Sequence, residues 1–291
     1  MSSMMRDPDM PDPHVPDWAN LELPDSWADQ LRLWRPWDLL KLMRRVLTKR
    51  QRVQLPVDMP GRELLPKYVL QEFHHLPNGN YSKQLTHGYI TGFDRLMLGT
   101  MRTARSHLAE SLRDCQSALD IGTAGGRTAA ALKAQGIGDV WGLDPSPYLL
   151  QHAARRFHGI NFVQGTAEQT PFPDQRFDGV VACFVLHELP PKQVSAALHE
   201  FARITKANGL LAICEPSAEQ LHGGFWLLLR KHGWRGVYFS WLAKLVHEPF
   251  VHAWHKIDLH RALAAAGFVC VSDEEQFPSR MVLARRVPTN A

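Results

Sequence analysis

The chain has 291 residues, of which 45% are hydrophobic, and a formal net charge of +4. This length and composition are sufficient for one large globular domain with a full core, alone or with an accessory piece. No run approaches the ~18 to 20 uncharged apolar residues of a membrane span, and the first residues lack the apolar stretch of a signal peptide. The four cysteines are widely spaced without a Cys-x-x-Cys pair, which argues against zinc ribbons and iron–sulfur clusters. We therefore predict a reduced, cytoplasmic protein without a metal site.

Residues 1–26 are predicted to form a tail. They contain six acidic residues, one arginine and five prolines. Such a composition is typical of segments that stay in solvent because they cannot bury enough apolar surface to fold. We therefore expect a disordered, acidic, proline-rich tail.

A helical N-terminal cap is predicted over residues 27–110, and its first part is basic. Residues 27–52 carry eight Lys or Arg against two Asp, with three tryptophans among them. Within 37–49 the apolar residues fall on one face of a helix, with cations beside or opposite it. The simplest expectation is a helix docked on the rest of the protein with its cations in water; peripheral membrane contact and nucleic-acid contact are the alternatives.

The most informative segment begins at residue 118. A buried strand ends in Asp120-Ile-Gly122, a glycine-rich turn follows, and a second apolar run ends in Asp144. This order is typical of the first half of a nucleotide-binding α/β unit. Turn glycines can adopt positive φ and let the backbone approach a ligand. The two oxygens of Asp144 are suited to accept hydrogen bonds from both hydroxyls of a ribose.

The same turn disfavours a dinucleotide cofactor. The dinucleotide pattern Gly-x-Gly-x-x-Gly requires a glycine where Ala124 stands. A carboxylate just before the turn, Asp120, would also repel a pyrophosphate, whereas it suits a ligand with a cationic amino acid end. A nicotinamide-dependent oxidoreductase is therefore the weaker alternative.

The pattern resembles the first motif of class I S-adenosylmethionine-dependent methyltransferases, of the small-molecule, type 11/25-like kind, which usually runs Asp-x-Gly-x-Gly-x-Gly. Asp120, Gly122 and Gly126 match it, and Ala124 replaces the middle glycine. Later segments resemble the family's further motifs in the family's order: 165–174, 176–189, 204–215, 263–271 and 280–285. The resemblance implies a Rossmann-like, seven-stranded, doubly wound α/β sheet with a C-terminal antiparallel hairpin over residues 111–291.

The resemblance also implies S-adenosylmethionine as the cofactor, and a set of residues around it. This set is Asp120, Gly122, Thr123, Gly125, Gly126, Asp144, Pro145, Thr166, Ala167, Glu168 and Cys183. The family commonly has Asp at the position of Thr166, so the adenine amino group must here meet the Thr hydroxyl, backbone, or no partner. In similar enzymes a tyrosine before the first strand closes over the methionine end of the cofactor. Tyr81 or Tyr89 could take this position, and an ordinary core or surface tyrosine is the alternative for each.

An insertion rich in tryptophan and histidine is predicted over residues 217–255, after the fifth strand. Ligands of open α/β folds bind at the carboxyl ends of the strands, so an insertion there would overhang the site as a lid. Packing of two helical layers against each other is the alternative. Gly233 and Gly236 are expected to break the insertion into shorter pieces.

His187 is the candidate catalytic residue, because an imidazole titrates near neutrality and the fourth strand ends just before it. In similar sequences a histidine at this point often supports the cofactor or the loop instead. His222, His252 and His255 in the insertion are weaker candidates. Since the sequence lacks the Asp/Asn-Pro-Pro-Tyr and Pro-Cys motifs of DNA methyltransferases, we expect no nucleic-acid substrate.

The predicted function is methyl transfer to a small, apolar or amphipathic acceptor. The alternative is a module that binds S-adenosylmethionine without catalysis and acts in regulation. The identity of the acceptor, the kind of atom methylated and the oligomeric state remain open at this point.

Overall fold

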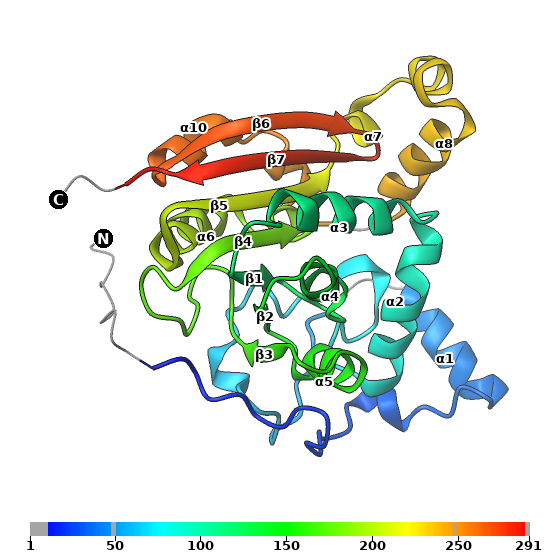
Figure 1. Ribbon diagram of the computed structural model, residues 1–291. Coiled ribbons are helices and arrows are strands. Elements are labelled where there is room, and N and C mark those ends of the chain that lie inside the picture. The colour runs from blue at the N-terminus through cyan, green and yellow to red at the C-terminus, as the bar shows by residue number, and fades with distance from the viewer. Residues whose placement is uncertain (1–10, 48–50, 247, 289–291) are drawn as a thin grey trace.

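The computed structural model describes residues 11–47, 51–246 and 248–288. Its centre is a seven-stranded sheet in the order β3-β2-β1-β4-β5-β7-β6 (Figure 1), in which β7 runs antiparallel to both of its neighbours. The strands are β1 (Ser117–Ile121), β2 (Asp139–Asp144), β3 (Asn161–Gln164), β4 (Phe177–Cys183), β5 (Thr205–Pro216), β6 (Phe268–Gln276) and β7 (Ser279–Arg286). The predicted sheet with its closing hairpin is confirmed.

Alternation along β1 shows why the sheet is covered on both faces. All five residues of β1 are buried. Leu119 and Ile121 belong to one hydrophobic cluster, while Ala118 belongs to another on the opposite face. Because successive side chains of a strand point to opposite faces, a strand that is apolar throughout requires a helical layer on each side.

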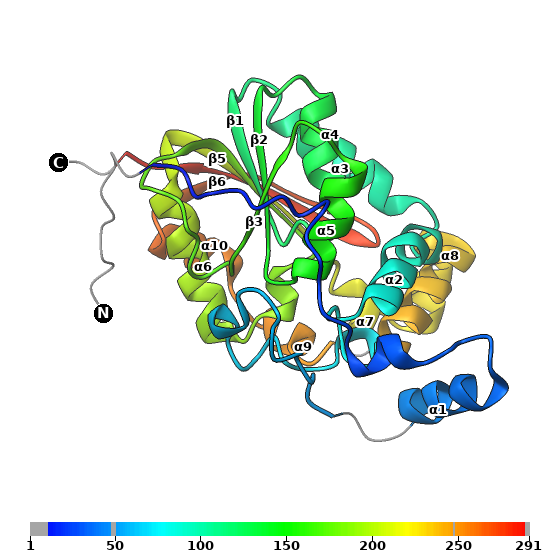
Figure 2. The same cartoon turned by 90° about the horizontal axis from the view of Figure 1, so that it is seen from below.

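Helices supply those two layers (Figure 2). One face carries α3 (Thr100–Ser111), α4 (Arg127–Ala134) and α5 (Pro147–Arg156). The other carries α6 (Pro191–Ile204) and α10 (Leu259–Ala265). The crossover helices place the carboxyl ends of β1, β2, β3 and β4 at one edge, where open α/β folds bind ligands.

The segment before the sheet is built from short pieces. Its elements are η1 (Trp27–Gln30), α1 (Pro36–Leu47), η2 (Arg62–Leu64), η3 (Phe73–His75) and α2 (Lys83–Leu96). The helix expected over 37–49 corresponds to α1, and residues 48 and 49 lie outside the described residues. Ser82 caps α2, since its hydroxyl accepts a hydrogen bond from the Leu85 N–H.

The prediction of a solvated tail is wrong for its second half. Trp18 is 3% exposed, and its indole N–H donates to the Phe162 carbonyl oxygen at 2.9 Å. Leu23 is also buried, and the Tyr148 hydroxyl donates to the Pro24 carbonyl oxygen. A few large apolar side chains thus anchor an otherwise acidic segment along α5 and β3, which average composition conceals. Residues 1–10 lie outside the described residues.

The segment after β5 contains α7 (Glu219–His222), α8 (Phe225–Leu245) and α9 (Val251–Trp254). Of the two glycines expected to break the segment, Gly233 does so inside α8, where its φ of 62° is not helical, whereas Gly236 keeps helical geometry. With a ψ of −153°, this is a positive-φ conformation that is essentially confined to glycine. Between β4 and α6 lies the short η4 (Leu186–Glu188).

Candidate functional site

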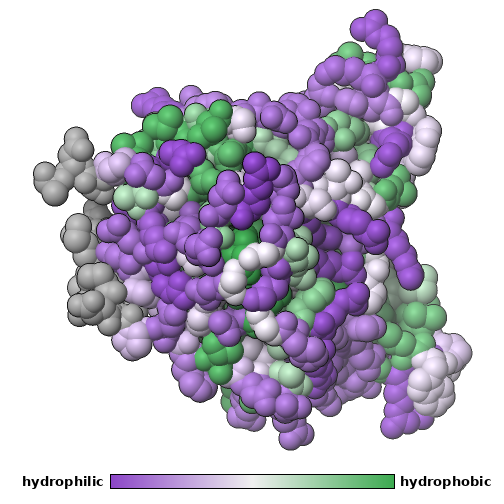
Figure 3. Space-filling model, viewed as in Figure 1, coloured by the Kyte–Doolittle hydropathy of each residue, from purple (hydrophilic) through white to green (hydrophobic). Residues whose placement is uncertain are grey.

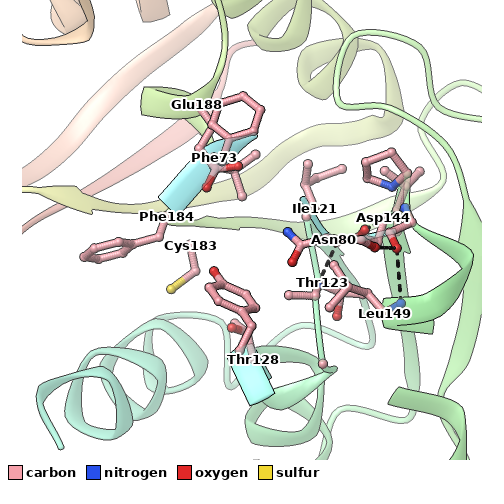
Figure 4. A pocket seen from close by; sticks show the side chains of 18 of the residues that line it. Phe73, Asn80, Ile121, Thr123, Thr128, Asp144, Leu149, Cys183, Phe184 and Glu188 are labelled. Atoms are coloured by element: carbon pink, nitrogen blue, oxygen red, sulfur yellow. Dashed lines mark hydrogen bonds between the residues drawn. The ribbon is translucent and has the colours of Figure 1, made fainter. Parts of the chain in front are cut away.

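A cavity of about 170 Å³ opens at the carboxyl ends of the strands. Gly122 follows β1, Asp144 ends β2 and Cys183 ends β4, and all three line the cavity. Figure 4 shows Asp144, Asn80 and Thr123 toward one end and Cys183, Phe184 and Glu188 toward the other. We call it the strand-end cavity.

The turn after β1 brings backbone against this cavity. Gly122 has a φ of 63°, and a Cβ built there would lie 2.5 Å from Cγ2 of Val185. Gly126 also has positive φ, and a Cβ would press on Ala153, Phe157 and Phe162. Any larger residue at either position would therefore force the turn or its neighbours to move.

Ala124 occupies the position of the middle glycine of the motif and keeps the glycine conformation. Its φ is 47°, in the left-handed region. This conformation costs an alanine roughly 1–2 kcal/mol. The backbone N–H of Ala124 donates to Asp144 Oδ2 at 2.9 Å, a contact that helps to hold the turn in this shape.

Asp144 is the carboxylate best suited to accept hydrogen bonds from the hydroxyls of a ribose. Its Oδ1 accepts from the Ser146 N–H at 2.8 Å, and the side chain is almost fully buried while lining the cavity. Burial raises the pKa of Asp144 to about 7. Further donors from a ligand would stabilise the ionised form.

Eight of the eleven predicted cofactor residues line the strand-end cavity. They are Gly122, Thr123, Gly125, Asp144, Pro145, Thr166, Ala167 and Cys183. The described lining does not include Asp120, Gly126 or Glu168.

These three residues do not line the cavity but stabilise its wall. Asp120 Oδ2 accepts from the Thr123 hydroxyl at 2.6 Å and from the Ala129 N–H at 3.0 Å, so its carboxylate ties the turn to α4. Burial raises the pKa of Asp120 to about 7. Glu168 accepts from the Tyr68 hydroxyl, and Gly126 is the N-cap residue that precedes α4. A sequence motif identifies a position without telling whether its side chain faces the ligand or the fold.

The segment over 51–82 covers the strand-end cavity, which the sequence did not reveal. Tyr68, Phe73, Asn80 and Tyr81 line the cavity from this side. Ser146 donates to the Asn80 carbonyl oxygen, fixing the cover to the end of β2. Tyr81 was a candidate from its place before the first strand; the others carry no motif.

A second cavity, of about 420 Å³, adjoins the first and is mainly apolar. Its walls come mainly from α2, η4, α7, α8 and α9. Four residues line both cavities: Tyr89, Phe93, Phe184 and Glu188. We call it the helical cavity. A group bound in one cavity therefore meets a group bound in the other at these four side chains.

His187 lines the helical cavity and belongs to a buried network of carboxylates and histidines. Its Nδ1 lies 2.5 Å from Glu215 Oε2, and its Nε2 lies 3.5 Å from Glu248 Oε2. Within the part of the chain that the structure describes, Nε2 makes no hydrogen bond. Burial alone would lower the pKa of His187, but the charges of Glu248 and Glu215 hold that pKa well above its usual range.

The carboxylates of this network have separate tasks. Glu215, at the end of β5, accepts from the backbone N–H groups of Val185, Leu186 and His187 and so holds η4 in place. Glu248 is free of such backbone contacts among the described residues, and the positive charge of His187 outweighs burial to lower the pKa of Glu248 to about 2.

His74 completes the network and was not a candidate. Its Nε2 lies 2.8 Å from Glu188 Oε1 and its Nδ1 3.8 Å from Glu248 Oε1. Its ring stacks on Tyr89, with centroids 5.5 Å apart. The φ of His74 is 53°, a conformation that costs a non-glycine residue energy and often occurs at functional sites.

The remaining histidine candidates lie at the edge of the site. His255 lines the helical cavity, with Nε2 3.2 Å from the Pro216 carbonyl oxygen. The ring centroid of His222 lies 5.8 Å from that of His252 and 5.6 Å from that of His255. No group of three or more possible metal ligands occurs within residues 11–47, 51–246 and 248–288.

Compared with known proteins, residues 119–213 match the family of methyltransferase domains. The chain therefore carries a methyltransferase domain. The matched stretch contains the turn after β1, Asp144 and η4, and the family resemblance predicted from the motifs is confirmed.

The matched part of the chain is also similar to curated methyltransferases. The chain is 36% identical over 115 residues to a demethylmenaquinone methyltransferase of Geobacillus stearothermophilus, a stretch that is 37% of this chain and 48% of that protein. It is 35% identical over 100 residues to an uncharacterized methyltransferase of Synechocystis, or 34% of this chain and 47% of that protein. The chain thus spans about half the length of these curated relatives.

The fold has a counterpart among solved structures. Human N-acetylserotonin methyltransferase, solved in complex with SAM, superposes with a TM-score of 0.54 over 88% of this chain and 69% of that chain, at 18% identity. At this identity the likeness concerns the fold alone.

Proposed function

We propose that the protein transfers a methyl group from S-adenosylmethionine to a small, apolar or amphipathic acceptor. The observation that carries this proposal is the pair of adjoining cavities, one at the strand ends that contains the Asp144 carboxylate and a more apolar one between helices, which meet at Tyr89, Phe93, Phe184 and Glu188. The methyltransferase domain match supports S-adenosylmethionine as the cofactor.

The strand-end cavity has the residues that this cofactor requires. Asp144 would accept from the ribose hydroxyls, and Thr166 and Ala167 would lie against the adenine. Backbone beside Gly122 and Cys183 would face the amino acid end. The fit is supported by the backbone of Gly122 and by the buried carboxylate of Asp144, which both line the cavity. Bound S-adenosylmethionine supplies a methyl group already activated on a sulfonium.

The helical cavity would hold the acceptor. Leu96, Met97, Leu242 and Val246 line it with apolar surface, which favours an apolar or amphipathic molecule over a charged one. Nucleic acid does not suit an enclosure of about 420 Å³ between helices.

His187 is the proposed general base. In its neutral form, Nδ1–H donates to Glu215, which leaves the Nε2 lone pair beside Glu248 in the wall of the helical cavity. A side-chain movement that brings Nε2 to the cavity would let it take a proton from an acceptor O–H, N–H or acidic C–H. The imidazolium that forms is stabilised by Glu248 and Glu215. This arrangement of a base oriented by a buried carboxylate recurs in many enzymes.

Two measurements test the proposal in sequence. Isothermal titration with S-adenosylhomocysteine should show binding, with NADH as the comparison ligand; absence of S-adenosylhomocysteine binding overturns it. Incubation with methyl-labelled S-adenosylmethionine and an organic extract of the organism's own cells should then place label in a small molecule. Binding without any transfer would favour the non-catalytic module, and label only in protein or RNA would refute the small-molecule acceptor.

A further inference from the structure

Helix α1 exposes its apolar face. Trp34, just before the helix, is 75% exposed and Trp37 is 76% exposed. Three more apolar residues of α1, namely Leu39, Leu40 and Met43, are exposed as well. A helix docked by its apolar face would bury these side chains, so the interpretation of α1 as an inward-packed surface helix does not hold for them.

Helix α8 shows the same feature. Trp226 is 78% exposed, Trp234 is 65% exposed and Trp241 is 56% exposed. The other side of the helix packs inward, because Leu228, Phe239 and Leu242 are buried. Single exposed apolar residues are ordinary, but two helices with five exposed tryptophans on or beside them are not.

Both helices lie on the same side of the molecule. Figures 1 and 2 show α1 and α8 at the same edge with α2 between them, and Figure 3 shows apolar side chains reaching the surface there among charged ones. We call the exposed residues of α1 and α8, with residues 31–35, the tryptophan face.

The charge of the tryptophan face is positive. Residues 225–245 contain four Lys or Arg and no Asp or Glu, and residues 31–47 contain five Lys or Arg and one Asp. The whole chain has a net charge of only +4, so the rest of the chain offsets about half of the excess in these two segments. Lys41 and Arg45 of α1 and Lys231 of α8 pair with Asp38, Glu72 and Glu219. Tryptophan with cations on helices is the composition of segments that lie in the interface of an anionic bilayer. None of the described helices is long and apolar enough to cross a membrane.

The helical cavity lies next to this face. Leu96 of α2 lines the cavity and is 42% exposed, while Leu242 and Val246 line it from α8 and its end. The α2 glycines on the cavity wall, Gly88 and Gly92, leave open space where a Cβ would stand. The apolar lining of the cavity therefore continues toward the side that carries the tryptophans.

We propose that the tryptophan face rests on an anionic membrane surface, so that an amphipathic acceptor enters the helical cavity from the lipid. The second clause rests on the proposed methyl transfer, but the first does not. Cations draw the face to anionic headgroups, and burial of the aromatic rings adds a part that salt does not screen.

Vesicle flotation tests the contact with the whole chain. The protein should float with vesicles of phosphatidylcholine and phosphatidylglycerol at low salt, at least tenfold more than with pure phosphatidylcholine. Raising the salt concentration should weaken binding without abolishing it. Failure to float with anionic vesicles at low salt overturns the proposal.

Three variants locate the contact. Trp34→Ala with Trp37→Ala, and Trp226→Ala with Trp234→Ala, should each reduce the bound fraction at least tenfold. The matched control is Val269→Ala with Val271→Ala, two exposed residues at the start of β6. In Figure 1 this end of β6 lies beside α10, away from α1 and α8. Equal floating of all variants would contradict the proposal.

Two accompanying measurements distinguish membrane contact from misfolding and from self-association. S-adenosylhomocysteine titration of each variant shows that the fold is intact, and its outcome for the wild type tests the proposed function separately from membrane contact. Light scattering after size exclusion tests the rival occupant, a second copy of this chain. A dimer that the tryptophan variants disrupt, together with no flotation of the wild type, would assign the face to self-association and overturn the proposal.

Discussion

The two cavities differ in how the chain builds them. The strand-end cavity is made largely by consecutive strand ends within residues 119–213, the part that matches a known family. The helical cavity is made mainly by α2, η4, α7, α8 and α9, which are separated by up to some 170 residues of sequence, and most of its lining lies outside the matched part. If the strand-end cavity holds the cofactor and the helical cavity holds the acceptor, as we propose, then cofactor binding is encoded locally, whereas the choice of acceptor depends mostly on segments outside the matched part.

The largest effect should come from the helical cavity. His187→Gln removes the proposed base and should lower the rate of methyl transfer about 100- to 10,000-fold, while the affinity for S-adenosylhomocysteine stays within a few-fold. His255→Gln, at another histidine of the same cavity but without a carboxylate partner in the described structure, should have a much smaller effect. Label transfer to the extract and calorimetry measure the two quantities. Equal loss in both variants would reassign His187 to a structural role.

The strand-end cavity should respond in the opposite way. Asp144→Asn removes the charge that would accept from the ribose hydroxyls, and hydrogen bonds to charged groups contribute about 1.5–3 kcal/mol each. We expect S-adenosylhomocysteine to bind roughly 100-fold more weakly, measured by calorimetry. Asp139→Asn, at the other end of the same strand, is the control, because Asp139 pairs with Arg176 outside the cavity. Similar affinities in both variants would contradict the role of Asp144.

How far the sequence predicts each cavity follows from the same contrast. The motif around Gly122 and Asp144 located the strand-end cavity, because a turn and a strand end are local features. The motif did not predict that the Asp120 side chain points toward α4, because that depends on the rotamer of a single side chain. His74 could not be found, because its partner Glu188 is 114 residues away and no local pattern records such a meeting. The tail was misjudged because two buried side chains, Trp18 and Leu23, outweigh its average composition.

Cofactor binding should also depend on pH. Burial raises the pKa of Asp144 to about 7 in the ligand-free protein, and donors from the ribose favour the ionised form. Binding should therefore be strongest above pH 7 and weaken as the pH falls through 7, by up to about tenfold per pH unit below it. Calorimetry with S-adenosylhomocysteine from pH 8 to 6 measures this. The slope should vanish in Asp144→Asn; a slope that persists there would indicate another titrating group.

In the helical cavity, Glu248→Gln should shift the pH dependence of the rate. Glu248 and Glu215 together hold the pKa of His187 above its usual range, so removing one negative charge lowers that pKa. Since the neutral form of His187 is the base, the rate rises as the pH passes upward through its pKa, and this rise should move to lower pH by about one unit or more. A pH–rate profile of label transfer measures it. An unchanged profile with a lower plateau would mean that Glu248 only positions neighbouring groups.

The smallest effect should come from the one strained residue of the turn after β1. Ala124 has a φ of 47°, which a glycine adopts without the roughly 1–2 kcal/mol that alanine loses there. The greater freedom of glycine in the unfolded chain offsets about 0.5–1 kcal/mol of this gain. Ala124→Gly should therefore raise the melting temperature by about 1–3 °C and leave S-adenosylhomocysteine affinity within a few-fold.

Ala130→Gly is the matched control, because Ala130 lies inside α4 and the same substitution in a helix costs about 1 kcal/mol. Opposite shifts of the two melting temperatures would show that the turn keeps the shape of the glycine motif at the expense of stability, whereas two decreases would mean that the alanine methyl group contributes packing that outweighs its backbone strain.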